Sequence, residues 1–283
     1  MDAPSIFFSS SDSPVYSSVL GFSEIYKRNK DGKFRIYKAL KPDYRGDPEF
    51  ESLLRKEFEI GYGLDHPNIC SIIAFLQDEE LGNCIEMEWV DGSTLRDIAS
   101  KGPLNKDLCR KIICETCDAL DYMHHRQIIH RDLKPENIII THNGHNVKII
   151  DFGLSDTDDF YIHKAPAGTR IYASPEQLNG QVLDARSDIY SLGIIISELA
   201  GKWYSHIAAR CLRREPSKRF QTAAQMKKAV LNTKPWWLLY LIAVIIIALV
   251  LFLSAEFIGR QREKAFDEAT EAIYNIGISQ DVL

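Results

Sequence analysis

Short apolar and aromatic runs alternate with turn residues over the first 88 residues of the chain. FRIYKAL at 34–40 and CIEMEWV at 84–90 are two of these runs. Runs of this length, rich in aromatic and branched residues and bounded by turns, are typical of β-strands. The pattern therefore predicts a small, strand-rich lobe over about residues 15–88, preceded by a leader segment at 1–14.

One helix interrupts these strands, and helices dominate after Leu95. Asp47 followed by Pro48 predicts a helix start, because aspartate caps free backbone amides and proline fits the first turn. This helix is expected to continue through Leu64. The change from strands to helices predicts a second, helical lobe over about 92–232, so the expected fold class is α+β with two lobes.

A long apolar stretch follows the second lobe. Residues 236–254 read WWLLYLIAVIIIALVLFLS and contain no charged side chain. A helix of about 19 residues is about 28 Å long, which matches the hydrocarbon core of a bilayer. Tryptophan and tyrosine at its start are typical of a membrane interface. A fully buried core helix is the alternative, but such helices rarely run this long without a polar residue. The stretch predicts one transmembrane helix.

Basic residues flank this stretch on both sides. Lys227, Lys228 and Lys234 precede it, and another basic group follows at 260–264. Since positive charge marks the cytoplasmic side, the lysines favour a cytoplasmic location for the part before the span, but not decisively. Residues 255–283 are then expected to form a short tail on the opposite side, too short for a domain. A homodimer formed through the span is possible, although the span lacks GxxxG.

Composition and charge exclude several other classes of protein. With 45% hydrophobic and 26% charged residues, the chain is expected to be globular. The net charge of −5 and the lack of a long basic run argue against nucleic-acid binding. Residues 1–18 lack the charged and apolar regions of a cleavable signal, so the N-terminal part is expected in the cytoplasm.

Three of the six cysteines have the spacing C-x4-C-x2-C. Cys109, Cys114 and Cys117 form this run, which superficially matches an iron–sulfur motif. They also lie within a helical pattern at 106–124, where cysteines three residues apart share one face. Packing as small hydrophobic side chains is therefore the favoured interpretation.

The segment HRDLKPEN at 130–137 carries the most informative chemistry. It is followed by IIIT, the turn HNGHN, VKII and then DFG at 151–153, which together predict a β-hairpin. Folding this hairpin places Asn137 and Asp151 on adjacent strands about 5 Å apart. Two such oxygen ligands suit Mg²⁺, which completes its shell with water and substrate phosphates. Asp132 could accept a hydroxyl proton, while Lys134 offsets charge on a moving phosphoryl group.

These residues resemble the catalytic loop and metal motif of eukaryotic-type protein kinases. The resemblance extends from about Val15 to Val230 and implies a membrane-anchored kinase that uses ATP and Mg²⁺. It implies that Asp132 is the catalytic base, that Lys134 contacts the transferred phosphate, and that Asn137 and Asp151 hold the metal. The lysine in HRDLKPEN is typical of serine/threonine kinases.

The small lobe contributes two further residues to this resemblance. Lys38 matches the strand lysine that binds ATP phosphates in the family. Glu57 lies at helical spacing from Leu53 and Leu54, so it interrupts the inward face of the first helix. A carboxylate in that position needs a cationic partner, and Lys38 is the expected one.

Downstream motifs also match the family. GTRIYASPE at 168–176 resembles the end of an activation segment, where Thr169 would help to position a serine or threonine substrate. The resemblance implies that Glu176 pairs with Arg219 near the end of the domain. It also implies that Asp188 is the buried aspartate at a helix start that holds the catalytic loop.

The stretch EMEWVDGSTL at 86–95 resembles the hinge between kinase lobes. Backbone groups of Glu88 and Val90 would then bind adenine, with Met87 guarding the pocket behind it. The glycine-rich loop that covers the phosphates is degenerate, since of its glycines only Gly21 remains in the neighbourhood. Glycine lets backbone amides approach phosphates closely, so its loss affects the binding of ATP.

The C-terminal part of the kinase-like region is also short. Only about 34 residues separate Ala200 from Lys234, so much of one helix of the family is expected to be missing. The favoured function is an active serine/threonine kinase acting on proteins at the membrane. The alternative is a pseudokinase that binds nucleotide as a membrane-anchored scaffold, motivated by the degenerate glycine loop. A small-molecule phosphotransferase of the same fold is disfavoured because GTRIYASPE indicates a protein substrate.

Overall fold

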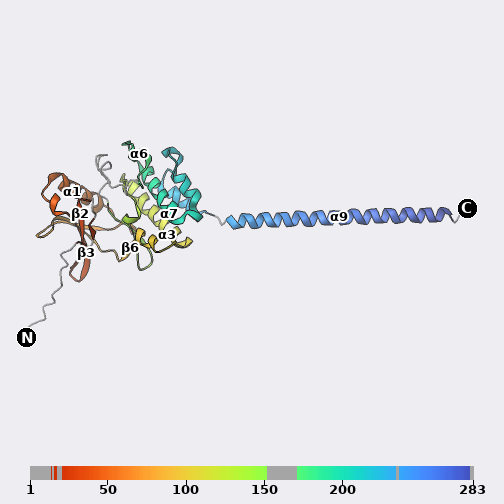
Figure 1. Cartoon of the computed structure of the whole chain (residues 1–283), viewed down its shortest axis with the longest axis horizontal. Coiled ribbons are helices and arrows are strands. Elements are labelled where there is room, and N and C mark those ends of the chain that lie inside the picture. Colours follow the sequence, from red (N-terminus) through yellow and green to blue (C-terminus); the bar gives the residue numbers. More distant parts are fainter. Residues whose placement is uncertain (1–13, 15, 18–20, 152–170, 234–235, 281–283) are drawn as a thin grey trace, which may run out of the picture. The chain divides into compact units, whose positions relative to one another are not determined.

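The computed structural model describes residues 14, 16–17, 21–151, 171–233 and 236–280. The chain divides into two units, Met1–Asn232 and Thr233–Leu283. The first unit has a sheet-rich part followed by a helical part, and the second is a single long helix (Figure 1). The predicted α+β fold with two lobes and one C-terminal apolar helix is therefore confirmed.

The small lobe is built on a five-stranded antiparallel sheet with the order β1-β2-β3-β5-β4. The strands are β1 Tyr16–Ser17, β2 Ser23–Lys30, β3 Lys33–Leu40, β4 Ile72–Asp78 and β5 Gly82–Glu88. β3 lies at the centre, so every residue from Ile36 to Leu40 is buried. Burial on both faces explains why this run lacks strict alternation of apolar and polar residues.

The helix α1, Pro48–Tyr62, packs against β3, β4 and β5. It begins where the sequence predicted, because the Asp47 carboxylate accepts a hydrogen bond from the Glu49 amide at 2.9 Å. It ends two residues before the predicted Leu64. Its buried face contains Leu53, Leu54 and also Glu57, which brings one carboxylate into the interior of the lobe.

The large lobe is helical and contains a small sheet with the order β6-β7-β8. Its strands are β6 Gly92–Thr94, β7 Ile138–Thr141 and β8 Val147–Ile149. Its helices are α2 Leu95–Ser100, α3 Lys106–His125, α6 Pro175–Leu178, α7 Ala185–Cys211 and α8 Ala223–Leu231. Short 3-10 helices span Pro135–Asn137 and Pro216–Lys218 in this lobe and Pro42–Tyr44 in the small lobe. α3 contacts α7, α8 and β8, and all six cysteines are buried free thiols, so the predicted core packing of Cys114 and Cys117 is confirmed.

A short segment of the small lobe is attached directly to β8. The Cys70 amide donates to the Ile149 carbonyl at 2.8 Å, and the Ile149 amide donates to the Asn68 carbonyl at 2.8 Å. Ile69 and Ile149 thus form a parallel bridge. Because Asp151 follows β8 by two residues, this bridge fixes the small lobe against the strand that leads to the predicted metal ligand.

The helix α7 folds back on itself. Ala200 and Tyr204 have non-helical backbone angles, so two helical segments meet there. A Cβ atom added to Gly193 would lie 2.4 Å from the Cys211 Cβ atom, although a straight helix would separate these residues by about 27 Å. The large lobe therefore passes from one helix to the next within a few residues, and Gly193 is required at the close contact.

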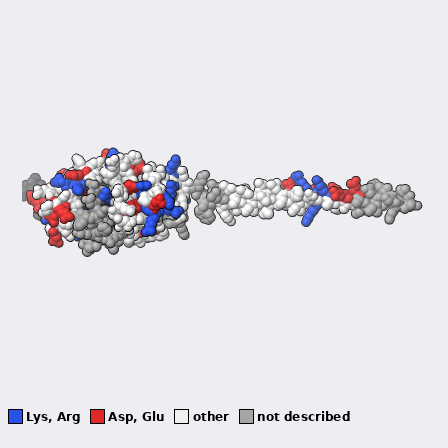
Figure 2. Space-filling view, turned by 90° about the horizontal axis from the view of Figure 1, so that it is seen from above, with Lys and Arg blue, Asp and Glu red and all other residues white. Residues whose placement is uncertain are grey.

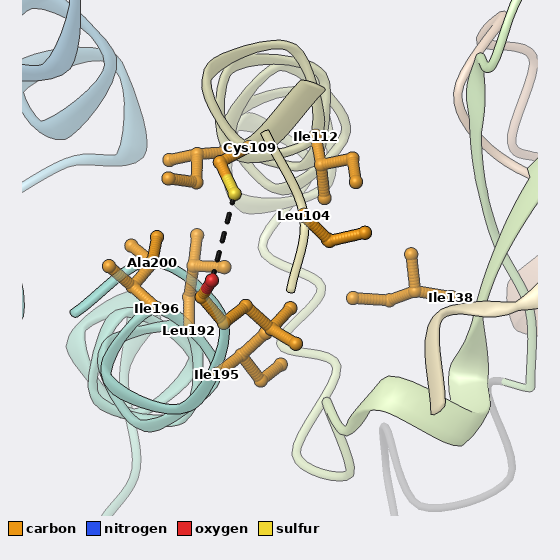
Figure 3. A pocket seen from close by; sticks show the side chains of 10 residues that line it. Leu104, Cys109, Ile112, Ile138, Leu192, Ile195, Ile196 and Ala200 are labelled. Atoms are coloured by element: carbon orange, nitrogen blue, oxygen red, sulfur yellow. Dashed lines mark hydrogen bonds between the residues drawn. The ribbon is translucent and has the colours of Figure 1, made fainter. Parts of the chain in front are cut away.

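A small apolar cavity lies between α3 and α7 (Figure 3). Cys109 and Ile112 face it from α3, and Leu192, Ile195 and Ile196 face it from α7. The Cys109 thiol donates weakly to the Leu199 carbonyl at 3.7 Å. None of the predicted site residues lines this cavity, and its apolar wall has nothing to bind a phosphate, so it is a packing defect of the core.

The second unit is the helix α9, Trp236–Gln280. Among the described residues it is the one helix long and apolar enough to cross a membrane, with Tyr240–Glu271 as the candidate span and a mean hydropathy of 2.9 in its most apolar window. None of that window is buried, unlike the core helix considered as the alternative. Figure 2 shows the uncharged stretch followed by a basic and then an acidic cluster. The predicted tail after residue 254 is therefore a continuation of the helix through Gln280.

Candidate active site

Asp188 holds the loop that carries the predicted catalytic residues. It lies in the first turn of α7, is fully buried, and accepts hydrogen bonds from the backbone amides of His130 and Arg131, each at 2.9 Å. His124 Nε2 lies 2.8 Å from the same carboxylate. Burial raises the pKa of Asp188, but the hydrogen bond and charge of His124 outweigh this, so the pKa is lower than usual. The carboxylate fixes the backbone just before Asp132.

Asp132, Lys134 and Asn137 form one hydrogen-bonded group. Lys134 Nζ donates to Asp132 Oδ2 at 2.6 Å, and Asn137 Nδ2 donates to the same oxygen at 3.1 Å and to the Asp132 carbonyl at 2.9 Å. Burial raises the pKa of the Asp132 carboxyl, and the Lys134 charge partly opposes this rise. A carboxylate with a raised pKa and a fixed orientation is suited to accept a proton.

The predicted hairpin is present, and it brings Asn137 and Asp151 to its open end. Ile138 is paired with Ile149, and the Ile150 amide donates to the Asn137 carbonyl at 3.0 Å. The local structure differs from the prediction in one respect. Asn137 ends the 3-10 helix Pro135–Asn137 rather than lying on a strand, and Asp151 follows β8 with a left-handed φ of 67°. The 3-10 helix that ends at Asn137 and the left-handed backbone of Asp151 direct these two residues in a way that regular strands would not.

Lys38 joins the two lobes at this point. Its Nζ lies 2.6 Å from Glu57 Oε1 and 2.8 Å from Asp151 Oδ1, so the predicted ion pair with Glu57 is present. Lys38 and Glu57 are both buried, at 6% and 2% exposure. Burial lowers the pKa of Lys38, but the charges of Asp151 and Glu57 more than offset this, so Lys38 stays protonated. Burial raises the pKa of Glu57 to about 7 despite the Lys38 charge.

The donor atoms around Asp151 fit a magnesium ion. The Asp151 side chain is 40% exposed, and the Asn137 amide nitrogen is turned toward Asp132. Among the described residues nothing donates to Asn137 Oδ1, so this oxygen and the Asp151 carboxylate can serve as ligands. Mg²⁺ takes one or two such protein oxygens and keeps water and phosphate oxygens in its remaining positions.

The same region of the chain matches a known family. Residues 21–205 match the model of the protein kinase domain. The chain belongs to the protein kinase family. Serine/threonine-protein kinase PknB of Mycolicibacterium smegmatis is 33% identical over 264 residues, which cover 77% of this chain and 42% of PknB. Serine/threonine-protein kinase PrkC of Bacillus subtilis is 40% identical over 167 residues, which cover 57% of this chain and 25% of PrkC. The matched part thus spans less than half the length of these relatives.

Solved structures of another kinase domain have the same fold as this chain. The crystal structure of the Mycobacterium tuberculosis PknI kinase domain superposes with a TM-score of 0.62 at 23% identity, covering 78% of this chain and 94% of that domain. A C20A_R136N double mutant of the same domain gives a TM-score of 0.63 at 23% identity. The likeness establishes the two-lobed kinase fold.

The stretch predicted to be the hinge begins within the last residues of β5 and continues after it. The Glu88 amide donates to the Ser71 carbonyl at 3.0 Å, and Val90 is buried. The Glu88 side chain is bound by Lys148 on β8 at 2.7 Å, a contact that the sequence analysis did not identify. In β8 the buried residues Val147 and Ile149 flank Lys148, so Lys148 points to the opposite face of the strand. The alternation of apolar and polar residues along this strand could therefore have indicated that the Lys148 side chain points away from the core. Gly21 lies just before β2, and the loop at 18–20 is outside the described residues.

Glu176 and Arg219 form the predicted ion pair in the large lobe of the kinase. Two nitrogens of the guanidinium lie 2.6 Å and 2.7 Å from the two carboxylate oxygens of Glu176. The remaining N–H groups donate to the carbonyls of residues 186, 213 and 214. All five donors of this arginine are therefore used. The hydrogen bond from Arg219 contributes to a lowered pKa of Glu176 against the effect of burial. Thr169 lies outside the described residues.

A further cluster beside the catalytic loop was missed from sequence. Arg96 of α2 donates from Nε to Glu136 Oε1 at 2.8 Å, and it also bonds the Tyr172 hydroxyl. The Tyr172 hydroxyl donates to Glu198 of α7 at 2.9 Å. Burial raises the pKa of Tyr172 to about 12. Because these residues come from four separate segments, no local pattern could have brought them together.

Proposed function

We propose that this chain is a magnesium-dependent protein serine/threonine kinase that transfers the γ-phosphate of ATP to hydroxyl groups of proteins at a membrane. The observation that carries the proposal is the convergence of Lys38, Glu57 and Asp151 with the group of Asp132 and Asn137. An intact ion pair between Lys38 and Glu57 and two oxygen ligands at one point are the arrangement that phosphoryl transfer requires.

Each residue has a distinct role in this proposal. Lys38, oriented by Glu57, binds ATP phosphates, while backbone groups of Glu88 and Val90 bind adenine and Gly21 contributes to the loop above the phosphates. Asp132 accepts the proton of the substrate hydroxyl, and Lys134 stabilises charge on the transferred group. Bound through Asn137 and Asp151, Mg²⁺ would supply positive charge that offsets charge developing on the phosphate oxygens.

Other residues act outside the chemistry. Thr169 would position the substrate serine or threonine. Glu176 with Arg219, and Asp188 with the catalytic loop, maintain the shape of the large lobe. PknB and PrkC are named serine/threonine-protein kinases, which supports protein hydroxyl groups as the acceptors.

We place the kinase unit in the cytoplasm and anchor it through the apolar part of α9. ATP is available on the cytoplasmic side, and Lys227, Lys228 and Lys234 precede the span on that side. Residues after the span would then lie on the opposite side of the membrane. The unit 15–232 would be the kinase domain, and 236–254 the membrane-crossing part.

Transfer of labelled γ-phosphate with Mg²⁺ by residues 1–234 tests the activity. Asp132→Ala and Asp151→Ala should each reduce transfer by at least about a hundredfold, because each removes a group needed in the transition state. Asp43→Ala, an exposed aspartate in the 3-10 helix of the small lobe, is the matched control and should leave transfer unchanged. If wild type and both variants are equally silent while ATP binds, the chain is instead a nucleotide-binding pseudokinase.

A further inference from the structure

The surface around the end of α7 and α8 is basic, although the chain as a whole is acidic. Residues 206–234 contain eight Lys or Arg residues and one acidic residue, Glu215, while the net charge of the chain is −5. Figure 2 shows Lys and Arg side chains gathered at this end of the kinase unit. Positive charge is therefore concentrated in the last part of the kinase unit.

Three side chains on this surface have no carboxylate partner within the described part of the chain. Arg213, Arg214 and Lys228 are exposed, and none of them takes part in an ion pair with a described residue. Most of the neighbouring basic side chains are already paired, namely Lys218 with Glu215, Arg219 with Glu176 and Lys227 with Asp118. The unpaired charges remain available for an external anion.

An apolar residue accompanies these charges. Leu231 is 56% exposed and lies three residues after Lys228, so the two side chains share one face of α8. No acidic residue occurs in α8, Ala223–Leu231. Basic residues beside an exposed leucine are typical of helices that lie on a membrane surface. Arg213 and Arg214 follow the end of α7, which packs against α8. We call Arg213, Arg214, Lys228 and Leu231 together the basic face.

The chain itself limits how far the basic face can be from a bilayer. Only residues 232–235 separate α8 from α9, and four residues span at most about 14 Å. In a membrane-inserted chain the end of α8 therefore stays close to the headgroups, within a distance similar to the Debye length of about 10 Å. A tether this short also gives the second contact a high effective concentration.

We propose that the basic face docks the kinase unit onto anionic phospholipid headgroups of the membrane that α9 crosses. Arg213, Arg214 and Lys228 bind the headgroup phosphates, and Leu231 enters the interface. This inference rests on the proposed membrane anchoring and is independent of kinase activity. Each basic residue shifts the ratio of docked to undocked kinase units about fivefold, so the three together contribute about a hundredfold.

Energy transfer in nanodiscs tests the proposal with the full chain. One donor dye is placed at Ser217→Cys beside the basic face and, in a second sample, at Glu79→Cys in the small lobe, while the acceptor is on a lipid headgroup. The six native cysteines are buried, so the introduced thiol is the one labelled. Discs of phosphatidylcholine are compared with discs containing about one third phosphatidylglycerol.

Energy transfer from the dye at position 217 should rise strongly in anionic discs and fall again in about 1 M salt. In anionic discs, energy transfer from the dye at position 79 should be lower than from the dye at position 217. The triple change Arg213→Glu, Arg214→Glu and Lys228→Glu should abolish the rise. The matched triple Lys33→Glu, Lys56→Glu and Lys101→Glu, which alters exposed lysines elsewhere by the same charge, should preserve it.

Three results would overturn docking. Equal transfer from Ser217 in both lipids with the chain inserted would exclude it, as would an equal effect of the two triple variants. Failure of the full chain to enter discs would remove the anchoring and the docking together. Because Arg219 uses the backbone carbonyls of residues 213 and 214, the side-chain changes leave that buried ion pair in place.

Discussion

Replacing Lys38 with methionine should abolish phosphate transfer and also destabilise the kinase unit in a pH-dependent way. The change leaves the Glu57 carboxyl buried at 2% exposure without the Lys38 cation that pairs with it. Glu57 already has a raised pKa of about 7 with Lys38 present, so removing the positive charge raises the pKa further. In the variant Glu57 is therefore protonated in the folded state at neutral pH.

The loss of folding stability follows from the difference in proton binding by Glu57 between the folded and unfolded states. The unfolded chain ionises its glutamates near pH 4.3, so each pH unit above this value costs about 1.4 kcal/mol when the folded state must stay protonated. Wild type carries most of the same cost up to pH 7, because its Glu57 has a folded pKa of about 7, and none of the further increase above that pH. From this source the variant and wild type therefore differ by well under 1 kcal/mol at pH 6 and by up to about 2.7 kcal/mol at pH 9. Stability of the variant relative to wild type falls as the pH rises above 7.

Urea unfolding of residues 1–232 at pH 6 and pH 9, in wild type and variant, measures this difference. Adding Glu57→Gln to Lys38→Met removes the ionisable group, so the double variant should recover most of this loss at pH 9 without recovering activity. A loss of equal size at both pH values would refute the reasoning, and so would further destabilisation on adding Glu57→Gln.

Three other changes test other parts of the structure. Arg219→Ala leaves the buried Glu176 carboxylate without its cation, so urea unfolding should show a loss of about 3–5 kcal/mol; a loss below about 1 kcal/mol would contradict this role. Asp188→Asn should cost about 2–3 kcal/mol at pH 7. Because the pKa of Asp188 is below its usual value, the wild-type advantage is present above about pH 4 and is lost as the pH falls further. Arg96→Ala should lower kcat about tenfold with an unchanged KM for ATP, since it frees Glu136 beside the catalytic loop; an altered KM alone would refute this.

The sequence predicted those features that depend on neighbouring residues. The start of α1 depends on Asp47 and Pro48, and the hairpin of β7 and β8 depends on a turn that contains Gly144, whose φ is 78°. The pairs of Lys38 with Glu57 and of Arg219 with Glu176 were found by resemblance to the family, because each pair joins segments far apart in the chain.

Other features depend on contacts that no local pattern records. Arg96 bonds Glu136 and Tyr172 only because α2, the catalytic loop and the segment before α6 meet in space. The left-handed backbone of Asp151, with a φ of 67°, is not encoded by the alternation of apolar and polar residues. The fold-back of α7 likewise depends on the contact of Gly193 with Cys211.

Because α9 is one continuous helix, movement at one end of the second unit is passed along the helix to the other end. Beyond residue 254 the helix runs for 26 more residues to Gln280, which corresponds to about 39 Å. A tilt of about 10° at the bilayer would therefore displace its far end by about 7 Å. If a binding partner moved that end sideways, the tilt of the helix relative to the bilayer normal would change at Trp236, where the helix begins.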